Sequence, residues 1–175
     1  MRNLIVGLIL LLSANAFAQP VKIEGPGPNW EWQQSDKYHG QVVVITVVSR
    51  YTEKESYQVN WRLGSRLENN DFRMITVIDF IGIPRLGFIY NYARKRILKE
   101  TTASNIKLKQ KGTSPISYIC DMKETLRDQL KADPRHRVDI IVIDRTGEVR
   151  GHFNGIMEIE QALKLIDELT EDGSR

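Results

Sequence analysis

The only cysteine of the chain, Cys120, is the first residue whose chemistry could define a function. It ends a short apolar run from Ile116 that predicts a strand, and Asp121 and Glu124 indicate a capped helix start directly after it. A helix N-terminus can lower the pKa of a nearby thiol, so Cys120 is the candidate lone redox thiol of a peroxidase or thiol oxidoreductase. The alternative, which we favour, is a small buried residue at the end of a strand.

Metal and cofactor chemistry lack a sequence signal. The three histidines, His39, His136 and His152, do not have the spacing of metal ligands. There is no Gly-x-Ser-x-Gly motif and no phosphate-binding loop. We therefore predict neither a metal nor a cofactor.

The stretch "VVVITVVSRYTEKESY" places a polar turn between a predicted strand and a predicted helix. The turn is Tyr51, Thr52, Glu53 and Lys54, and Thr52 with Glu55 fits a capping box. In such a box the Thr52 hydroxyl accepts from the N–H of Glu55, and the Glu55 carboxylate reaches back to the N–H of Thr52. This cap contributes about 1 kcal/mol, and the alternative reading of the same residues is a polar binding rim.

A basic segment follows in the second half of the chain. Between positions 85 and 111 only Glu100 opposes eight basic residues: Arg85, Arg94, Lys95, Arg96, Lys99, Lys107, Lys109 and Lys111. Such a patch attracts anionic partners, and the first five are the candidate anion- or partner-binding residues. Envelope lipids, cell-wall polyanions and an acidic protein are the alternatives, beside an ordinary solvated helix face. Nucleic acid is not expected, because no binding strand with interleaved aromatic residues is present.

The N-terminus carries a targeting pattern. A basic start, the apolar run Leu4–Leu12 and the small residues Ala16 and Ala18 are typical of a cleaved signal peptide. We expect cleavage after Ala18 and an exported, periplasmic protein that is not an integral membrane protein; the pattern leaves secretion beyond the envelope open. We assign residues 1–18 to the signal peptide, 19–34 to an N-terminal arm that is irregular from Pro20 to Asn29, 35–170 to one domain and 171–175 to a flexible tail.

The elements that must position these residues alternate between strands and helices. Apolar runs predict strands at 42–49, 72–80, 116–120 and 138–143, with a hairpin partner at 148–153. Apolar stripes predict helices at 53–68, 88–100, 124–132 and from Ile156 onward. This order favours an α/β fold with a mostly parallel, helix-covered sheet and an antiparallel end. The loop "DFIGIPRLG" ends a central strand, so Phe80, Ile81 and Ile83 are expected to line a pocket beside Thr52.

Three segments resemble the redoxin branch of the thioredoxin-like superfamily: "SDKYHGQVVVITVVSR", "SYICDMKETLRDQL" and "VDIIVIDRTGEVRGHFNG". The segment "FRMITVIDFIGIPRLGFIYNYARKRI" is most similar to the YtfJ family of exported thioredoxin-like proteins. The resemblance implies a three-layer α/β/α sandwich whose mixed sheet has parallel central strands and an antiparallel C-terminal hairpin.

The same resemblance implies what the turn does. Active relatives hold a Cys-x-x-Cys there, and alignment places Tyr51 and Lys54 where the two thiols fall. The cis-proline that faces those thiols is replaced by Val138 or Asp139. The resemblance therefore implies a protein without thiol–disulfide catalysis, and so not an enzyme, that binds a protein or ligand in the cell envelope. Redox chemistry through Cys120 alone is the alternative.

Overall fold

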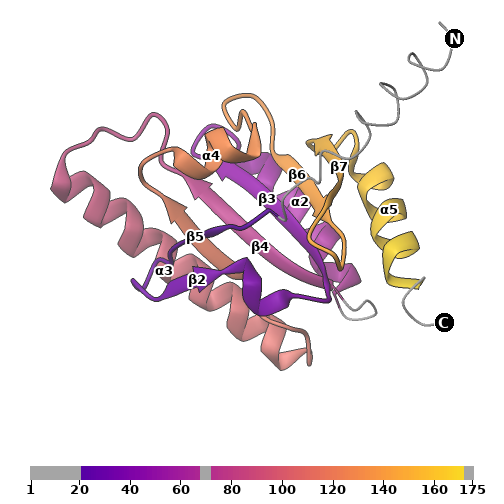
Figure 1. Cartoon of the computed structure of the whole chain (residues 1–175). Coiled ribbons are helices and arrows are strands. Elements are labelled where there is room, and N and C mark those ends of the chain that lie inside the picture. Colours follow the sequence, from indigo (N-terminus) through magenta and orange to yellow (C-terminus); the bar gives the residue numbers. More distant parts are fainter. Residues whose placement is uncertain (1–20, 68–71, 172–175) are drawn as a thin grey trace, which may run out of the picture.

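A five-stranded mixed sheet forms the centre of the computed structural model, which describes residues 21–67 and 72–171 (Figure 1). The strand order is β5-β4-β3-β6-β7. The parallel strands are β3 (Val42–Ser49), β4 (Phe72–Asp79) and β5 (Ser117–Asp121). The antiparallel end consists of β6 (Asp139–Ile143) and β7 (Val149–Asn154). The predicted fold class is confirmed.

Strand β3 has its central place because its sequence suits a strand covered on both faces. All eight of its residues are buried, and they are β-branched apart from the last. Its odd and even positions point into two separate apolar cores. Val42, Val44 and Val48 belong to one of these cores, and Val43 and Ile45 belong to the other.

Helices cover the first face of the sheet. Val59 and Leu63 of α2 (Glu53–Arg66) pack there with Ile166 of α5 (Ile159–Glu171), and α3 (Gly87–Gln110) contributes Leu108. Helix α2 ends two residues before the predicted position. Asn69 and Asn70, expected as its end, lie outside the described residues.

The second face has a thinner cover. Leu126 and Leu130 of α4 (Thr125–Leu130) pack there with Ile23, and Tyr38 of the short 3₁₀ helix η1 (Ser35–Tyr38) lies beside them. The sheet and the elements packed on its two faces form the three layers that the resemblance implies.

Residues 20–29 of the arm were predicted to be irregular, and that prediction is wrong for Glu24–Pro26. The arm contains an antiparallel pair of short strands, β1 (Glu24–Pro26) and β2 (Trp32–Gln34). Ile23 anchors it in the second core, and the Ser35 hydroxyl accepts the Ile23 N–H at 2.9 Å. The predicted signal peptide and the residues after 171 lie outside the described part of the chain.

Helix α3 was predicted to end near Glu100, but it continues for another ten residues. The side chain of Asn105 explains the extension. It bonds the Ile116 N–H at 3.0 Å and the Ile116 carbonyl at 2.9 Å, which ties the last turns of the helix to the chain entering β5. Gly112, at φ +75°, then ends the helix. Of the described helices, none is both long enough and apolar enough to cross a membrane.

Candidate functional site

The carboxyl ends of the three parallel strands lie at one edge of the sheet. Strand pairing puts Ser49, Asp79 and Asp121 at the same level, and the turn into α2 begins there. This is the edge at which open α/β sheets place their ligands. The residues of the turn, of the loop after β4 and of the segment before β6 therefore decide its chemistry.

The predicted capping box is wrong. The Thr52 hydroxyl turns back to the end of β3, where it accepts the Ser49 N–H at 3.0 Å and lies 3.3 Å from the Ser49 carbonyl oxygen. No side-chain hydrogen bond caps the N-terminus of α2. The first helical bond is made by the backbone, from the N–H of Ser56 to the carbonyl of Thr52. The start of α2 therefore keeps its partial positive charge.

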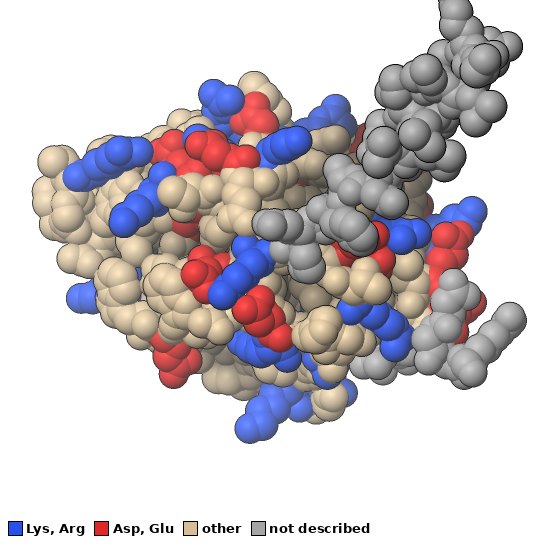
Figure 2. Space-filling model, viewed as in Figure 1, with Lys and Arg blue, Asp and Glu red and all other residues tan. Residues whose placement is uncertain are grey.

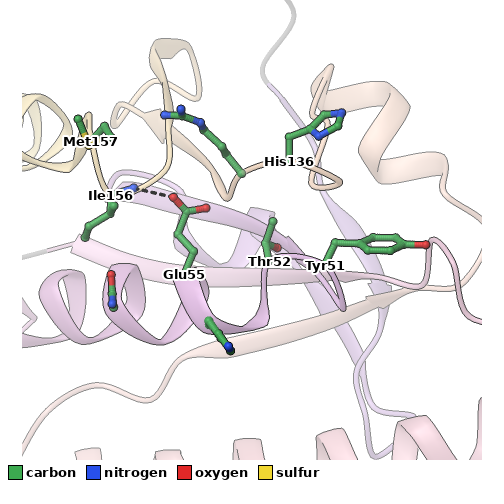
Figure 3. A pocket seen from close by; sticks show the side chains of 9 residues that line it. Tyr51, Thr52, Glu55, His136, Ile156 and Met157 are labelled. Atoms are coloured by element: carbon green, nitrogen blue, oxygen red, sulfur yellow. Dashed lines mark hydrogen bonds between the residues drawn. The ribbon is translucent and has the colours of Figure 1, made fainter.

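Glu55, the expected partner in that box, instead joins three parts of the chain. Its carboxylate accepts the N–H of Val138, just before β6, at 2.8 Å, and the N–H of Ile156, after β7, at 3.1 Å. Figure 3 shows it pointing from α2 toward Ile156. Gly155 lies close against this carboxylate at φ +64°, where a side chain would collide with it.

A hollow of roughly 470 Å³ opens beside the start of α2. Figure 3 shows its lining, which comes from the turn before α2 and α2 itself, from the segment before β6 and from the turn before α5: Tyr51, Thr52, Lys54, Glu55, Gln58, His136, Arg137, Ile156 and Met157. Lys54 and Arg137 supply positive charge, and Met157 is exposed. The hollow therefore brings two cationic side chains and apolar groups together with the Glu55 carboxylate, at a helix start that no side chain caps.

The loop after β4, which the sequence predicted to line a pocket beside Thr52, does not line this hollow. Phe80 is buried and packs against the ring of Tyr90 with centroids 5.2 Å apart, and the loop residues Ile81 and Ile83 do not line the hollow. The sequence indicates that Arg135–Arg137 is part of a basic loop. Only the tertiary structure brings it against α2.

The loop after β4 instead braces the turn. The Arg50 guanidinium donates to the carbonyl of Gly82 at 2.7 Å and lies 5.4 Å from the centre of the Tyr51 ring. Tyr51 remains more than half exposed. It is thus available to a partner at the rim of the hollow.

Cys120 lies near the end of β5 and is only 1% exposed. Burial raises the pKa of its thiol to about 12, against a small lowering by the nearby Arg94. The favoured prediction of a small buried residue is therefore confirmed, and the alternative of a thiol activated by the following helix start is contradicted. That start is capped by Asp121, whose carboxylate accepts the N–H groups of Thr125, Leu126 and Arg127 at 2.8–3.0 Å.

Asp79 is the one buried carboxyl group at this edge whose pKa is strongly displaced. Burial raises it to about 6, although the N–H of Ile81, at 2.6 Å, and the Arg127 guanidinium oppose the change. Its Oδ2 lies 3.7 Å from Arg127 and accepts no hydrogen bond. Asp121 and Glu124 add to the rise.

The structure divides the predicted anion-binding residues into two groups. Arg94 donates to the carbonyl of Pro28 at 2.6 Å and stacks on Trp30 at 4.3 Å, so it holds the arm. Arg96 pairs with Glu53 and Glu100 at 2.9 Å, and Arg85 pairs with Glu124 at 3.2 Å. By contrast, Lys95 and Lys99 are exposed and have no ion-pair partner within the described ranges.

Within residues 21–67 and 72–171, no group of three His, Cys, Asp or Glu side chains could hold a metal ion. His152 lies 2.7 Å from Asp139 and is therefore part of the antiparallel pair β6–β7.

Comparison with known proteins gives a fold but no family. No protein-family model and no curated protein matches the sequence. Among solved structures, the exposed lipoprotein thioredoxin Etrx1 of Streptococcus pneumoniae is similar at a TM-score of 0.61 and 14% identity, covering 85% of this chain and 100% of that one.

Two further structures give the same result. A secreted thiol-disulfide isomerase of Corynebacterium glutamicum is similar at a TM-score of 0.60 and 14% identity. The match covers 87% of this chain and 86% of that one. A putative thiol:disulfide interchange protein DsbE of Chlorobium tepidum is similar at a TM-score of 0.58 and 14% identity. The match covers 86% of this chain and 94% of that one. The chain therefore has a thioredoxin-like fold.

Proposed function

We propose that this chain is a thioredoxin-fold binding protein of the cell envelope that works without thiol–disulfide catalysis. One observation carries the proposal: the edge where this fold offers a helix N-terminus has no thiol, and the single cysteine is buried with a pKa raised to about 12. Thiol chemistry requires an accessible thiolate. The YtfJ family is the relationship that best fits this absence.

The hollow beside α2 suits a segment of a partner protein. Lys54, Arg137 and the uncapped helix start favour a negative group there. Ile156, Met157 and Tyr51 offer apolar contact around it. An acidic segment that also carries apolar side chains matches this combination.

Two observations support export. The N-terminal sequence has the signal-peptide pattern, and two of the similar structures are described as an exposed lipoprotein and a secreted protein. We propose the periplasm as the compartment.

The alternative function is redox chemistry through Cys120. It is favoured by the names of the similar structures, which include thiol-disulfide isomerase and interchange proteins. The burial of Cys120 opposes it, because the thiol would have to become exposed before it could react.

Capture of a partner from envelope extract tests the proposal. We expect the wild-type protein to retain a partner that Lys54→Glu/Arg137→Glu loses, because both cations line the hollow. The matched control Lys123→Glu/Lys131→Glu changes the charge equally on an exposed surface away from the hollow, and it should retain the partner.

Equal retention by both double variants would contradict binding at the hollow. Turnover of a disulfide substrate serves as the second readout, and we expect it to equal the background rate. Turnover by the wild type that disappears in Cys120→Ala would establish the alternative function instead.

A further inference from the structure

The outer face of α3 combines apolar and basic side chains along one line. Successive members of this line are three, four or seven residues apart, which puts them on one side of a helix. We call this line the outer stripe of α3; it consists of Phe88, Tyr92, Lys95, Lys99, Ile106 and Lys109. The helix has 24 residues, so the stripe extends over roughly 30 Å.

The apolar members of the stripe are exposed to an unusual degree. Phe88 is 74% exposed, Tyr92 72% and Ile106 53%. Only Thr101 of the whole helix is fully buried, while its inner residues, such as Ile89 and Ile97, are half-buried. Large apolar side chains gathered on one exposed line indicate a contact surface.

The charge of the stripe is uncompensated. Helix α3 carries six basic residues and one acidic residue, Glu100, which pairs with Arg96. Lys95, Lys99 and Lys109 have no ion-pair partner in the described part of the chain. In Figure 2, basic side chains project along the lower edge, where Figure 1 places the C-terminal end of α3.

We propose that the outer stripe of α3 docks on a lipid surface rich in anionic headgroups, with the helix lying in the plane of the surface. The order of side chains favours lipid over protein. In protein interfaces the apolar residues form the core, and lysine is depleted from it. Here Lys95 and Lys99 lie at the middle of the line, between Phe88 and Tyr92 on one side and Ile106 on the other.

That order fits a bilayer interface. Lysines pair with anionic headgroups, while aromatic and aliphatic side chains enter the boundary below them. The inference concerns a different surface from the hollow beside α2. It does not depend on the proposed function.

Vesicle co-sedimentation of the full chain tests the proposal, with vesicles of phosphatidylcholine alone or mixed with phosphatidylglycerol. We expect binding to the anionic vesicles that weakens with salt. Lys95→Glu/Lys99→Glu/Lys109→Glu should lower the partition coefficient by on the order of a hundredfold. Phe88→Ala/Tyr92→Ala should remove the binding that persists at high salt.

The matched control is Lys123→Glu/Lys131→Glu/Lys164→Glu, which makes the same charge change at exposed lysines outside α3. It carries the same N-terminus, so any contribution of residues 1–18 cancels. We expect it to bind like the wild type, and all variants should show wild-type circular dichroism and melting, because the altered side chains are exposed.

Three results would overturn the proposal. The first is equal binding of wild type and stripe variant to anionic vesicles, and the second is no binding by the wild type. The third is wild-type retention on immobilised polyglutamate, or self-association in sedimentation, that the stripe variant loses while vesicle binding stays unchanged. That result would assign the stripe to an acidic protein or to a second copy of this chain.

Discussion

Cys120 illustrates how burial decides the chemistry of a single residue. Its sequence neighbours left two interpretations: a buried residue at the end of a strand, which we favoured, and a thiol activated by the helix start that Asp121 and Glu124 indicate. The Asp121 carboxylate caps that start itself, and the sulfur lies in the interior. Burial favours the neutral thiol over the thiolate and so reverses the expected direction of the pKa change.

We predict that native Cys120 reacts with iodoacetamide on the order of a hundredfold or more slower at pH 8 than the same thiol in guanidinium chloride. The physical reason is the small thiolate fraction together with the lack of access. Mass spectrometry of the alkylated protein over time measures both rates, and Cys120→Ala serves as the blank. A native rate equal to that of the unfolded chain would show that the thiol is accessible.

At the scale of elements, Glu55 connects the start of α2 to both sides of the antiparallel pair. Its carboxylate accepts one N–H before β6 and another after β7. Without Glu55, these two half-buried N–H groups would lose the carboxylate that accepts their hydrogen bonds. The side chain therefore fixes how α2 lies against the C-terminal half of the sheet.

We predict that Glu55→Ala lowers the free energy of unfolding by about 1–3 kcal/mol, because two charge-assisted hydrogen bonds are lost. Glu55→Gln should cost less, since one oxygen remains as an acceptor. Urea denaturation followed by circular dichroism measures both. Glu53→Ala, which removes only an exposed pair with Arg96, is the matched control and should change little. If the two alanine variants were equally stable, the bridging role of Glu55 would be refuted.

The five strands of the central sheet and its helices could be predicted from the sequence, but the strand pair β1–β2 and several side-chain partners could not. Strand β3 could be predicted because an unbroken run of β-branched residues favours a buried strand over a helix. The end of α3 was missed because the bond that supports it joins Asn105 to Ile116, eleven residues away. Thr52 and Glu55 matched a local cap, yet distant partners compete for the Glu55 carboxylate, and the Thr52 hydroxyl bonds Ser49 instead.

At the scale of the whole molecule, Asp79 makes stability depend on pH. The pKa of this buried carboxyl is raised to about 6 from an ordinary value of 3.8. The folded state therefore holds the proton more tightly than the unfolded chain. The contribution of protonated Asp79 to the stability of the folded state is fully present below pH 3.8 and is lost as the pH rises through about 6.

We predict that ionisation of Asp79 lowers the free energy of unfolding by about 2–3 kcal/mol between pH 4 and pH 7. This contribution adds to those of the other groups that titrate in the same range. Asp79→Asn should remove this component, because an amide does not ionise. The comparison is the unfolding free energy of both proteins in urea from pH 4 to pH 8. Parallel curves for the two proteins would mean that Asp79 does not titrate in this window.

The sequence by itself determined the fold class, the order of strands and helices and the absence of a thiol at the start of α2. These follow from apolar periodicity and residue identity, which are local properties. Only the tertiary structure decided between the two interpretations of Cys120, linked Glu55 of α2 to the segments just before β6 and just after β7, and brought Lys54 and Arg137 into one hollow. Burial and hydrogen-bond partners depend on segments that are far apart in the chain, so they exist only once the sheet has brought those segments together.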